Sequence, residues 1–160
     1  MKHTLSVTVE NHPGVLTRVA SLFRRRGYNI DSLAVGRTEE PDVSRMTIVV
    51  EGDAGVLEQV TKQLHKLVEV IKIMDVTSEE TVDRELVLIK VKADPAARAE
   101  IMQIVDIFRA RIVDIGRATL MIEATGDESK IDAIEESLRP FGMLELVRTG
   151  KVSMVRGPKS

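Results

Sequence analysis

The first half of the chain alternates between two hydrophobic periods. Alternation of apolar and polar positions, or a short apolar run, is typical of strands, and such segments occur at residues 5–10, 28–37, 44–51 and 68–76. Two longer segments repeat apolar residues every three or four positions, as one face of a helix does, at residues 13–26 and 54–66. The predicted order is strand, helix, strand, strand, helix, strand.

The second half repeats this order. Strands are predicted at residues 86–92, 111–116, 118–124 and 143–149. One helix starts at the cap and proline of Asp94–Pro95, and another is capped by Asp127. The repeat lies in element order and spacing and not in residue identity. The sequence therefore predicts an α+β fold of two ferredoxin-like βαββαβ units, each an antiparallel sheet with two helices on one face.

These patterns divide the chain into parts. The first unit is predicted at residues 1–77, a polar linker at 78–84, the second unit at 85–150 and a fraying tail at 151–160.

One face of the first predicted sheet has no helix to cover it. Depending on register, that face carries aliphatic residues from the set Leu33, Val35, Val49, Ile71 and Ile73. Exposed aliphatic side chains on a sheet favour association with another subunit.

Composition narrows the function classes. The chain has 160 residues, 43% of them hydrophobic and 30% charged, which is typical of a globular protein. The formal net charge of −2 gives no electrostatic reason to expect a nucleic acid or an anionic membrane as partner. The absence of cysteine excludes disulfides, thiolate metal sites and cysteine nucleophiles.

Targeting signals also bear on location. The N-terminus runs directly into a predicted strand without an apolar signal core, and no segment approaches the ~20 apolar residues that cross a bilayer. We therefore expect a cytoplasmic protein without membrane contact.

The order βαββαβ also describes a common RNA-recognition module. That module stacks bases on aromatic residues of its central strands. The corresponding strands here, residues 44–51 and 118–124, contain no aromatic residue. RNA binding is therefore not expected.

The usual catalytic constellations are missing from the sequence. The three histidines, His3, His12 and His65, are scattered without metal-ligand spacing. No phosphate loop and no dinucleotide fingerprint occur. We expect neither a catalytic site nor a metal on this chain.

The turn "NHPGVL" at residues 11–16 is the strongest candidate site. Proline at the first helical position and Gly14 in the first turn would leave several backbone N–H groups without an acceptor, which fits a carboxylate. The amide of Asn11 can bind a carboxylate or an ammonium group, and Val15 and Leu16 provide apolar walls. Asn29 adds a second amide. A plain helix start is the alternative reading.

The second half provides an internal comparison. Its corresponding turn, "ADPAA" at residues 93–97, keeps the proline but has neither glycine nor asparagine. A start signal alone therefore does not require the extra residues of the first turn. The odds move toward a small zwitterion with an aliphatic side chain as ligand.

A second feature is the run Arg24-Arg25-Arg26 at the end of the first helix. Cations there complement the helix dipole. Docking of a partner is the alternative reading.

Three stretches carry a family resemblance: "VENHPGVLTRVASLFRRRGYNIDSL", "VSRMTIVV" and "LEQVTKQLHKLVEVIKI". With the whole chain, they strongly resemble the small regulatory subunits of acetolactate (acetohydroxyacid) synthase. The N-terminal half also resembles an ACT domain, a ferredoxin-like module that senses amino acids. The resemblance covers Asn11, Gly14 and Asn29, whereas His12 and Pro13 are local variants.

The resemblance implies a partner and an effector. The partner would be the large catalytic subunit, which carries thiamine diphosphate, Mg and FAD, with no cofactor on this chain. This chain would activate it and confer feedback inhibition by valine, or by leucine or isoleucine. ACT domains would pair as a homodimer, with the loop from Asn11 to Leu16 of one protomer facing Asn29 and Ile30 of the other.

Two further functions are open at this point. A free-standing amino-acid sensor could act on another partner, although no DNA-binding helix-turn-helix is appended. A catalyst in its own right would show turnover by the isolated chain.

Overall fold

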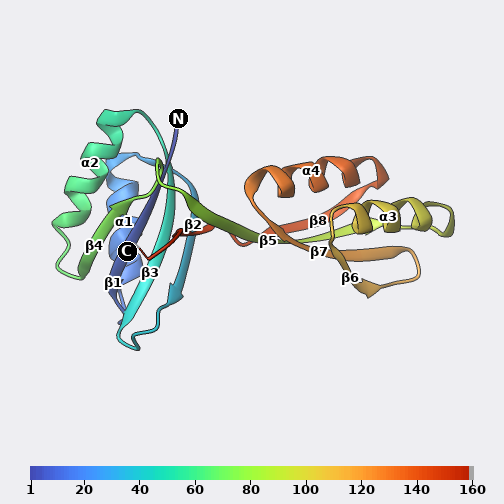
Figure 1. The fold of residues 1–160 in the computed structure, drawn as a ribbon, viewed down its shortest axis with the longest axis horizontal. Coiled ribbons are helices and arrows are strands. Elements are labelled where there is room, and N and C mark those ends of the chain that lie inside the picture. Colours follow the sequence, from blue (N-terminus) through green and yellow to red (C-terminus); the bar gives the residue numbers. More distant parts are fainter. Residues whose placement is uncertain (159–160) are drawn as a thin grey trace. The chain divides into compact units, whose positions relative to one another are not determined.

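A computed structural model gives the fold and describes residues 1–158 (Figure 1). The chain forms two compact units. The first contains Met1–Val82 together with residues 151–158 of the C-terminal segment, and the second contains Asp83–Gly150. Each unit is an antiparallel sheet with two helices, so the predicted fold class is confirmed.

The first unit is built on a four-stranded sheet with the order β2-β3-β1-β4. Helices α1 and α2 cover one face, where the side chains of Leu5, Ile48 and Phe23 are among the most buried. The bounds of its strands and helices are β1 (Lys2–Glu10), α1 (Val15–Arg26), β2 (Asn29–Arg37), β3 (Val43–Glu51), α2 (Ala54–His65) and β4 (Val70–Asp75).

The second unit repeats the architecture with the strand order β6-β7-β5-β8. Its core is aliphatic, as the aromatic content of 2% requires, and includes Ile89, Ile101 and Ile122. The bounds are β5 (Thr81–Lys92), α3 (Pro95–Ile107), β6 (Arg111–Ile115), β7 (Thr119–Gly126), α4 (Glu128–Leu138), the 3₁₀ turn η1 (Arg139–Phe141) and β8 (Met143–Arg148).

Three of the four helices begin in the same way. Asp53, Asp94 and Asp127 each accept a hydrogen bond from the backbone N–H three residues further on, at 2.9 Å. These bonds satisfy first-turn donors that have no acceptor within the helix, and those of Asp94 and Asp127 confirm the caps predicted above. Helix α1 starts differently and is described below.

The predicted linker at residues 78–84 is wrong in its second part. Strand β5 already begins at Thr81, although this segment is polar and has no clear period. Its backbone is paired by β9 (Val152–Val155), and the N–H of Arg156 donates to the carbonyl of Glu80 at 2.8 Å. A partner distant in sequence therefore makes this segment a strand.

The predicted fraying of the tail is also wrong for residues 151–156, whereas residues 159–160 of the predicted tail lie outside the described residues. The backbone N–H of Lys151 donates to Ser32 Oγ at 3.0 Å, and its Nζ donates to Thr4 Oγ1 at 2.9 Å. Ser32 and Thr4 flank Val49 in the strand register, on the face away from the helices. The C-terminal segment thus lies on the sheet face that was expected to be bare.

Because the C-terminal segment covers this sheet face, the expected exposure of its aliphatic residues has to be reconsidered. Val49 is only 4% exposed. Leu33 and Ile73 belong to the helix-covered face and pack against the core. Only Val35 and Ile71 of the expected set are exposed. A continuous aliphatic sheet face is therefore not the reason for any pairing of this unit.

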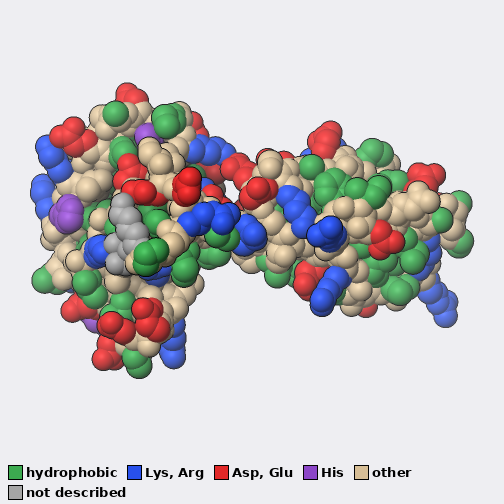
Figure 2. Space-filling view, in the orientation of Figure 1, with side chains coloured by type: hydrophobic (Ala, Val, Ile, Leu, Met, Phe, Trp, Pro, Cys, Tyr) green, Lys and Arg blue, Asp and Glu red, His purple; other side chains and the backbone are tan. Residues whose placement is uncertain are grey.

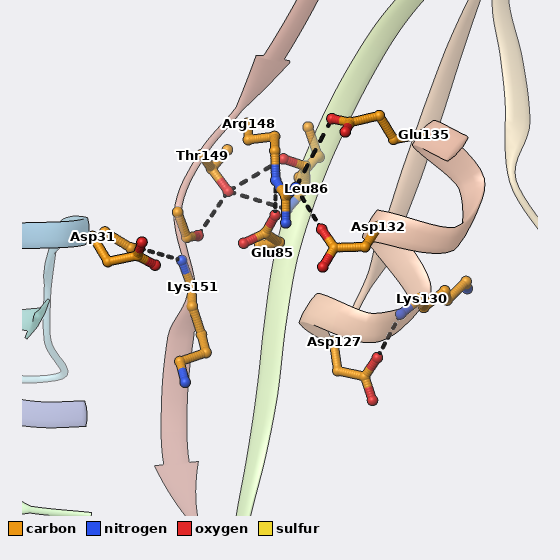
Figure 3. A network of polar contacts seen from close by, with 12 residues as sticks. Asp31, Glu85, Leu86, Asp127, Lys130, Asp132, Glu135, Arg148, Thr149 and Lys151 are labelled. Carbon is orange, nitrogen blue, oxygen red and sulfur yellow. Dashed lines mark hydrogen bonds and ion pairs between the residues drawn. The ribbon is translucent and has the colours of Figure 1, made fainter. Parts of the chain in front are cut away.

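In the second unit an ion-pair network joins β5, β8 and α4 (Figure 3). Arg148 binds the carboxylate of buried Glu85, and its Nη1 lies 2.8 Å from Asp132 Oδ1 and 4.0 Å from Glu135. Partial burial lowers the pKa of the Arg148 guanidinium, but its hydrogen bonds to Asp132 and Glu85 outweigh this and raise the pKa. Arg148 therefore stays charged and holds the edge of the sheet to α4.

The burial of Glu85 predicts a marked stability effect. Glu85→Gln removes the buried charge that compensates Arg148, and we expect the free energy of unfolding to fall by about 2–3 kcal/mol. The matched control is Asp132→Asn, because Asp132 binds the same arginine but is 57% exposed; its expected cost is below about 1 kcal/mol.

Urea unfolding followed by two spectroscopic signals distinguishes the two units and measures these effects. The single tyrosine, Tyr28, lies in the first unit, so its fluorescence reports that unit, whereas far-UV circular dichroism reports both. Glu85→Gln should lower the dichroism midpoint and leave the tyrosine transition in place. Equal effects of the two variants would contradict the assigned role of Glu85.

Candidate functional site

The turn before α1 differs from the prediction in its backbone. Pro13 is not the first helical residue; α1 begins at Val15, and Gly14 caps it with φ 90° and ψ −15°. This left-handed conformation is strained for residues with a side chain. The backbone conformation therefore favours glycine at position 14, and the sequence pattern alone did not show that this conformation is left-handed.

The start of α1 still offers unpaired donors. No side chain of the described residues caps it. The carbonyl of Gly14 accepts from Arg18 at 3.0 Å, and the N–H of Val15 makes only a long bond of 3.5 Å to the His12 carbonyl. The N–H groups of Leu16 and Thr17, in the same first turn, have no acceptor within the helix.

The space beside these donors is open. A Cβ atom at position 14 would have no neighbour within 4 Å. The helix dipole adds a partial positive charge at this end. The arrangement can therefore receive a small anion such as a carboxylate.

Asn11 is held by the loop between β2 and β3. Its backbone N–H donates to the Asp42 carbonyl at 2.8 Å, and its side-chain Nδ2 donates to the Pro41 carbonyl at 3.3 Å. Among residues 1–158, its Oδ1 atom accepts no hydrogen bond. The oriented amide therefore presents an acceptor, which suits an ammonium group. Sequence reasoning missed these two carbonyls, because nothing in residues 38–42 marks Asn11 as their partner.

Charged side chains surround the turn. His12 Nε2 lies 3.1 Å from Glu10 Oε2, and this hydrogen bond, with a weaker one to the Pro13 carbonyl, raises the pKa of His12. Arg18 Nε lies 3.1 Å from the buried carboxylate of Glu69. The two acids are thus each matched by a base, so the turn keeps little net charge when His12 is protonated.

The predicted apolar residues play unequal parts. Val15 is 4% exposed and packs in the core, so its side chain does not line the surface at the turn. Leu16 is 47% exposed beside the open donors. Ile30 is partly buried against the core. Of the three, Leu16 has the position of an apolar wall within one chain.

Asn29 is far from Asn11 in the same chain. Asn29 begins β2 and pairs with Glu51, which pairs with Lys2 at the start of β1. Asn11 follows the other end of β1, so the two amides lie at opposite ends of the sheet. A strand of nine residues spans roughly 30 Å. One chain therefore does not assemble the full set of predicted site residues.

Other site types were sought in the described residues. Within 1–158, no three His, Asp or Glu side chains gather in a way that could hold a metal ion. No helix over the same residues is long and apolar enough to cross a membrane.

Comparisons with known proteins give concordant results for both halves of the chain. Residues 5–72 match the family model of the AHAS small subunit-like ACT domain, and residues 84–157 match that of the small subunit of acetolactate synthase.

Full-length relatives agree with these matches. A probable acetolactate synthase small subunit of Archaeoglobus fulgidus is 61% identical over 99% of both chains. The acetolactate synthase small subunit of Mycolicibacterium smegmatis is 54% identical over 98% of this chain and 92% of its own.

A solved structure matches as well. The crystal structure of the acetolactate synthase small subunit from Thermotoga maritima has a TM-score of 0.91 and 44% identity, covering 99% of both chains. The fold, the turn at α1 and these similarities together show that the chain belongs to the family of acetolactate synthase small subunits, with an ACT domain as its first unit.

Proposed function

We propose that this chain activates the catalytic subunit of acetolactate synthase and makes that subunit sensitive to inhibition by valine. The observation that carries the proposal is the start of α1, where unpaired N–H groups, an open space beside Gly14 and the free Oδ1 of Asn11 occur together. These groups match the two charges of an amino acid.

The ligand contacts follow from this chemistry. The valine carboxylate binds the N–H groups near Gly14, and the ammonium group binds the Oδ1 of Asn11 or the amide of Asn29. The isopropyl group contacts Leu16 and Ile30. One methylene changes the binding free energy in a pocket by only about 1–3 kcal/mol, so leucine and isoleucine are further effectors of the same site, and its residues do not rank the three amino acids.

The topology supports a pocket shared by two chains. Strand β2 is an edge of its sheet. In an antiparallel β2–β2 pairing of two copies that is centred on Leu33, Asn29 of one copy lies opposite Arg37 of the other. Arg37 is in register with Ser44, which pairs with Val9, two residues before Asn11. Such a homodimer brings together the amides that one chain keeps apart.

A shared pocket also explains how binding changes activity. A ligand shifts an equilibrium only if it binds one state more tightly than another. In an interface pocket, the dimer geometry sets the pocket geometry, so valine favours one arrangement of the two ACT domains. The catalytic subunit, with its thiamine diphosphate, Mg and FAD, responds to that arrangement.

Reconstitution tests the proposal. The purified catalytic subunit is assayed for acetolactate formation alone, with this chain, and with this chain plus valine. We expect added chain to raise the rate and valine to lower the raised rate. If the chain binds valine but neither binds nor activates the catalytic subunit, it is a free-standing sensor instead. Turnover by the isolated chain would indicate a catalyst.

A further inference from the structure

A basic groove lies at the far end of α1 from the effector turn. It has a volume of about 450 Å³ and is lined by the ends of α1 and α2 and the residues that follow α2. Its lining consists of Leu22, Arg25, Arg26, Gln63, Lys66 and Leu67. Three of these six side chains are cations and none is an anion.

The cations of the groove are unpaired in the part of the chain that the structure describes. Within residues 1–158, Arg25, Arg26 and Lys66 form no ion pair with any carboxylate of the chain. Arg18 and Arg139, in contrast, each pair with a carboxylate, and acidic and basic side chains are mixed on the face drawn in Figure 2. The local positive charge therefore remains available to a partner.

The helix dipoles account for only part of this charge. Arg26 ends α1, and Lys66 caps α2. A helix end carries about −0.5 charge, so the two ends balance about one of the three cations. About two positive charges remain in a groove whose floor includes the buried side chain of Leu22.

We propose that this groove binds an acidic segment of the catalytic subunit. The proposal rests on the proposed function, in which this chain works by binding that subunit. A peptide suits the groove because Leu22 and Leu67 supply apolar contacts, Gln63 supplies an amide for a backbone, and the cations fit carboxylates. A bare phosphate suits it less, because it has no apolar group for Leu22 and Leu67 and no backbone N–H to donate to Gln63 or to the carbonyl oxygens at the helix C-termini.

The groove is far enough from Gly14 for the segment of the catalytic subunit and valine to bind at the same time. Helix α1 has twelve residues and is about 18 Å long, so a segment in the groove does not cover Gly14. Arg26, which lines the groove, precedes Asn29 by only three residues in the sequence. A partner in the groove thus contacts the chain next to the second half of the proposed effector site.

Charge reversal tests the groove. Arg25→Glu with Lys66→Glu should weaken binding of the purified catalytic subunit on the order of 100-fold in surface plasmon resonance. Arg24→Glu with Lys62→Glu is the matched control, because Arg24 and Lys62 are cations in the last turns of the same two helices but do not line the groove. It changes the charge by the same amount at the same two helix ends and should bind within about threefold of the original chain. Circular dichroism and thermal midpoints verify folding of all variants.

The outcomes separate the two proposals. If the unaltered chain fails to bind the catalytic subunit, the proposed function is overturned. If the unaltered chain binds and the groove variant binds equally well, only the groove is overturned. Equal losses in the groove variant and in the control Arg24→Glu with Lys62→Glu also overturn it, because they indicate a general charge effect.

Carbodiimide cross-linking identifies the occupant. This reagent condenses the Lys66 amine with a carboxylate in contact, forming an amide with loss of water. Mass spectrometry of the complex with the catalytic subunit should find Lys66 joined to an Asp or Glu of that subunit. Lys66→Arg keeps the charge but removes the amine, so the cross-link should vanish while binding persists. Absence of any such cross-link in the complex of the unaltered chain would contradict the proposal.

Discussion

Gly14→Asp is expected to abolish valine inhibition of the reconstituted enzyme while leaving its activation intact. The new carboxylate would accept the free N–H groups at the start of α1 and would repel the carboxylate of valine. The space beside position 14 is open, so the side chain needs no rearrangement of neighbours. Loss of about 3 kcal/mol of binding corresponds to a rise on the order of 100-fold in the inhibitory valine concentration.

Asparagine is the matched control at this position. Asn and Asp both tolerate a left-handed backbone better than other residues with side chains, so Gly14→Asn imposes a similar strain at φ 90°. It lacks the negative charge, and the inhibitory concentration should rise much less than in Gly14→Asp. Full valine sensitivity of the Asp variant, measured in the acetolactate assay, would show that valine binds elsewhere.

The second large effect concerns the two amides. Asn11→Ala and Asn29→Ala should each raise the inhibitory valine concentration on the order of tenfold, because each removes one hydrogen bond to a charged group. Calorimetric titration with valine, on the chain alone and in the complex, measures the loss. If a variant binds valine with the original affinity, the asparagine that it replaces is not part of the valine site.

Much of the fold could be predicted from hydrophobic periodicity. Strands β5 and β7 bury every second side chain, as Val87, Ile89 and Val91 of β5 show, and the aspartate caps mark three helix starts. Hydrophobic periodicity did not predict a strand at residues 81–84, because pairing with β9, and not burial of one face in the core, makes this part of β5 a strand. Pairing between distant segments leaves no local pattern in the sequence.

The structure of the candidate turn was predicted in part, and its role as a site stays a prediction. The turn at residues 11–16 is identifiable because it contains Asn11 in addition to the proline and glycine of a helix start. The left-handed backbone of Gly14 and the carbonyls of Pro41 and Asp42 that hold Asn11 could not be foreseen. Val15 illustrates the limit of the apolar pattern, since a core residue and a pocket wall have the same side chain. Only the strand register reveals that Asn11 and Asn29 are at opposite ends of one sheet.

The separation of Asn11 and Asn29 makes the shared pocket the central claim. Two mixed dimers that contain the same two substitutions test it directly. In the first dimer, one chain carries Asn11→Ala and the other carries Asn29→Ala. In the second dimer, one chain carries both substitutions and the other chain carries neither. Differently tagged chains allow each mixed dimer to be purified.

Calorimetric counting of high-affinity valine sites is the decisive measurement. A pocket shared between chains predicts one intact site in the first dimer, formed by the two unaltered amides, and none in the second. One site in the second dimer and none in the first would mean that each pocket belongs to a single chain, and would contradict the account.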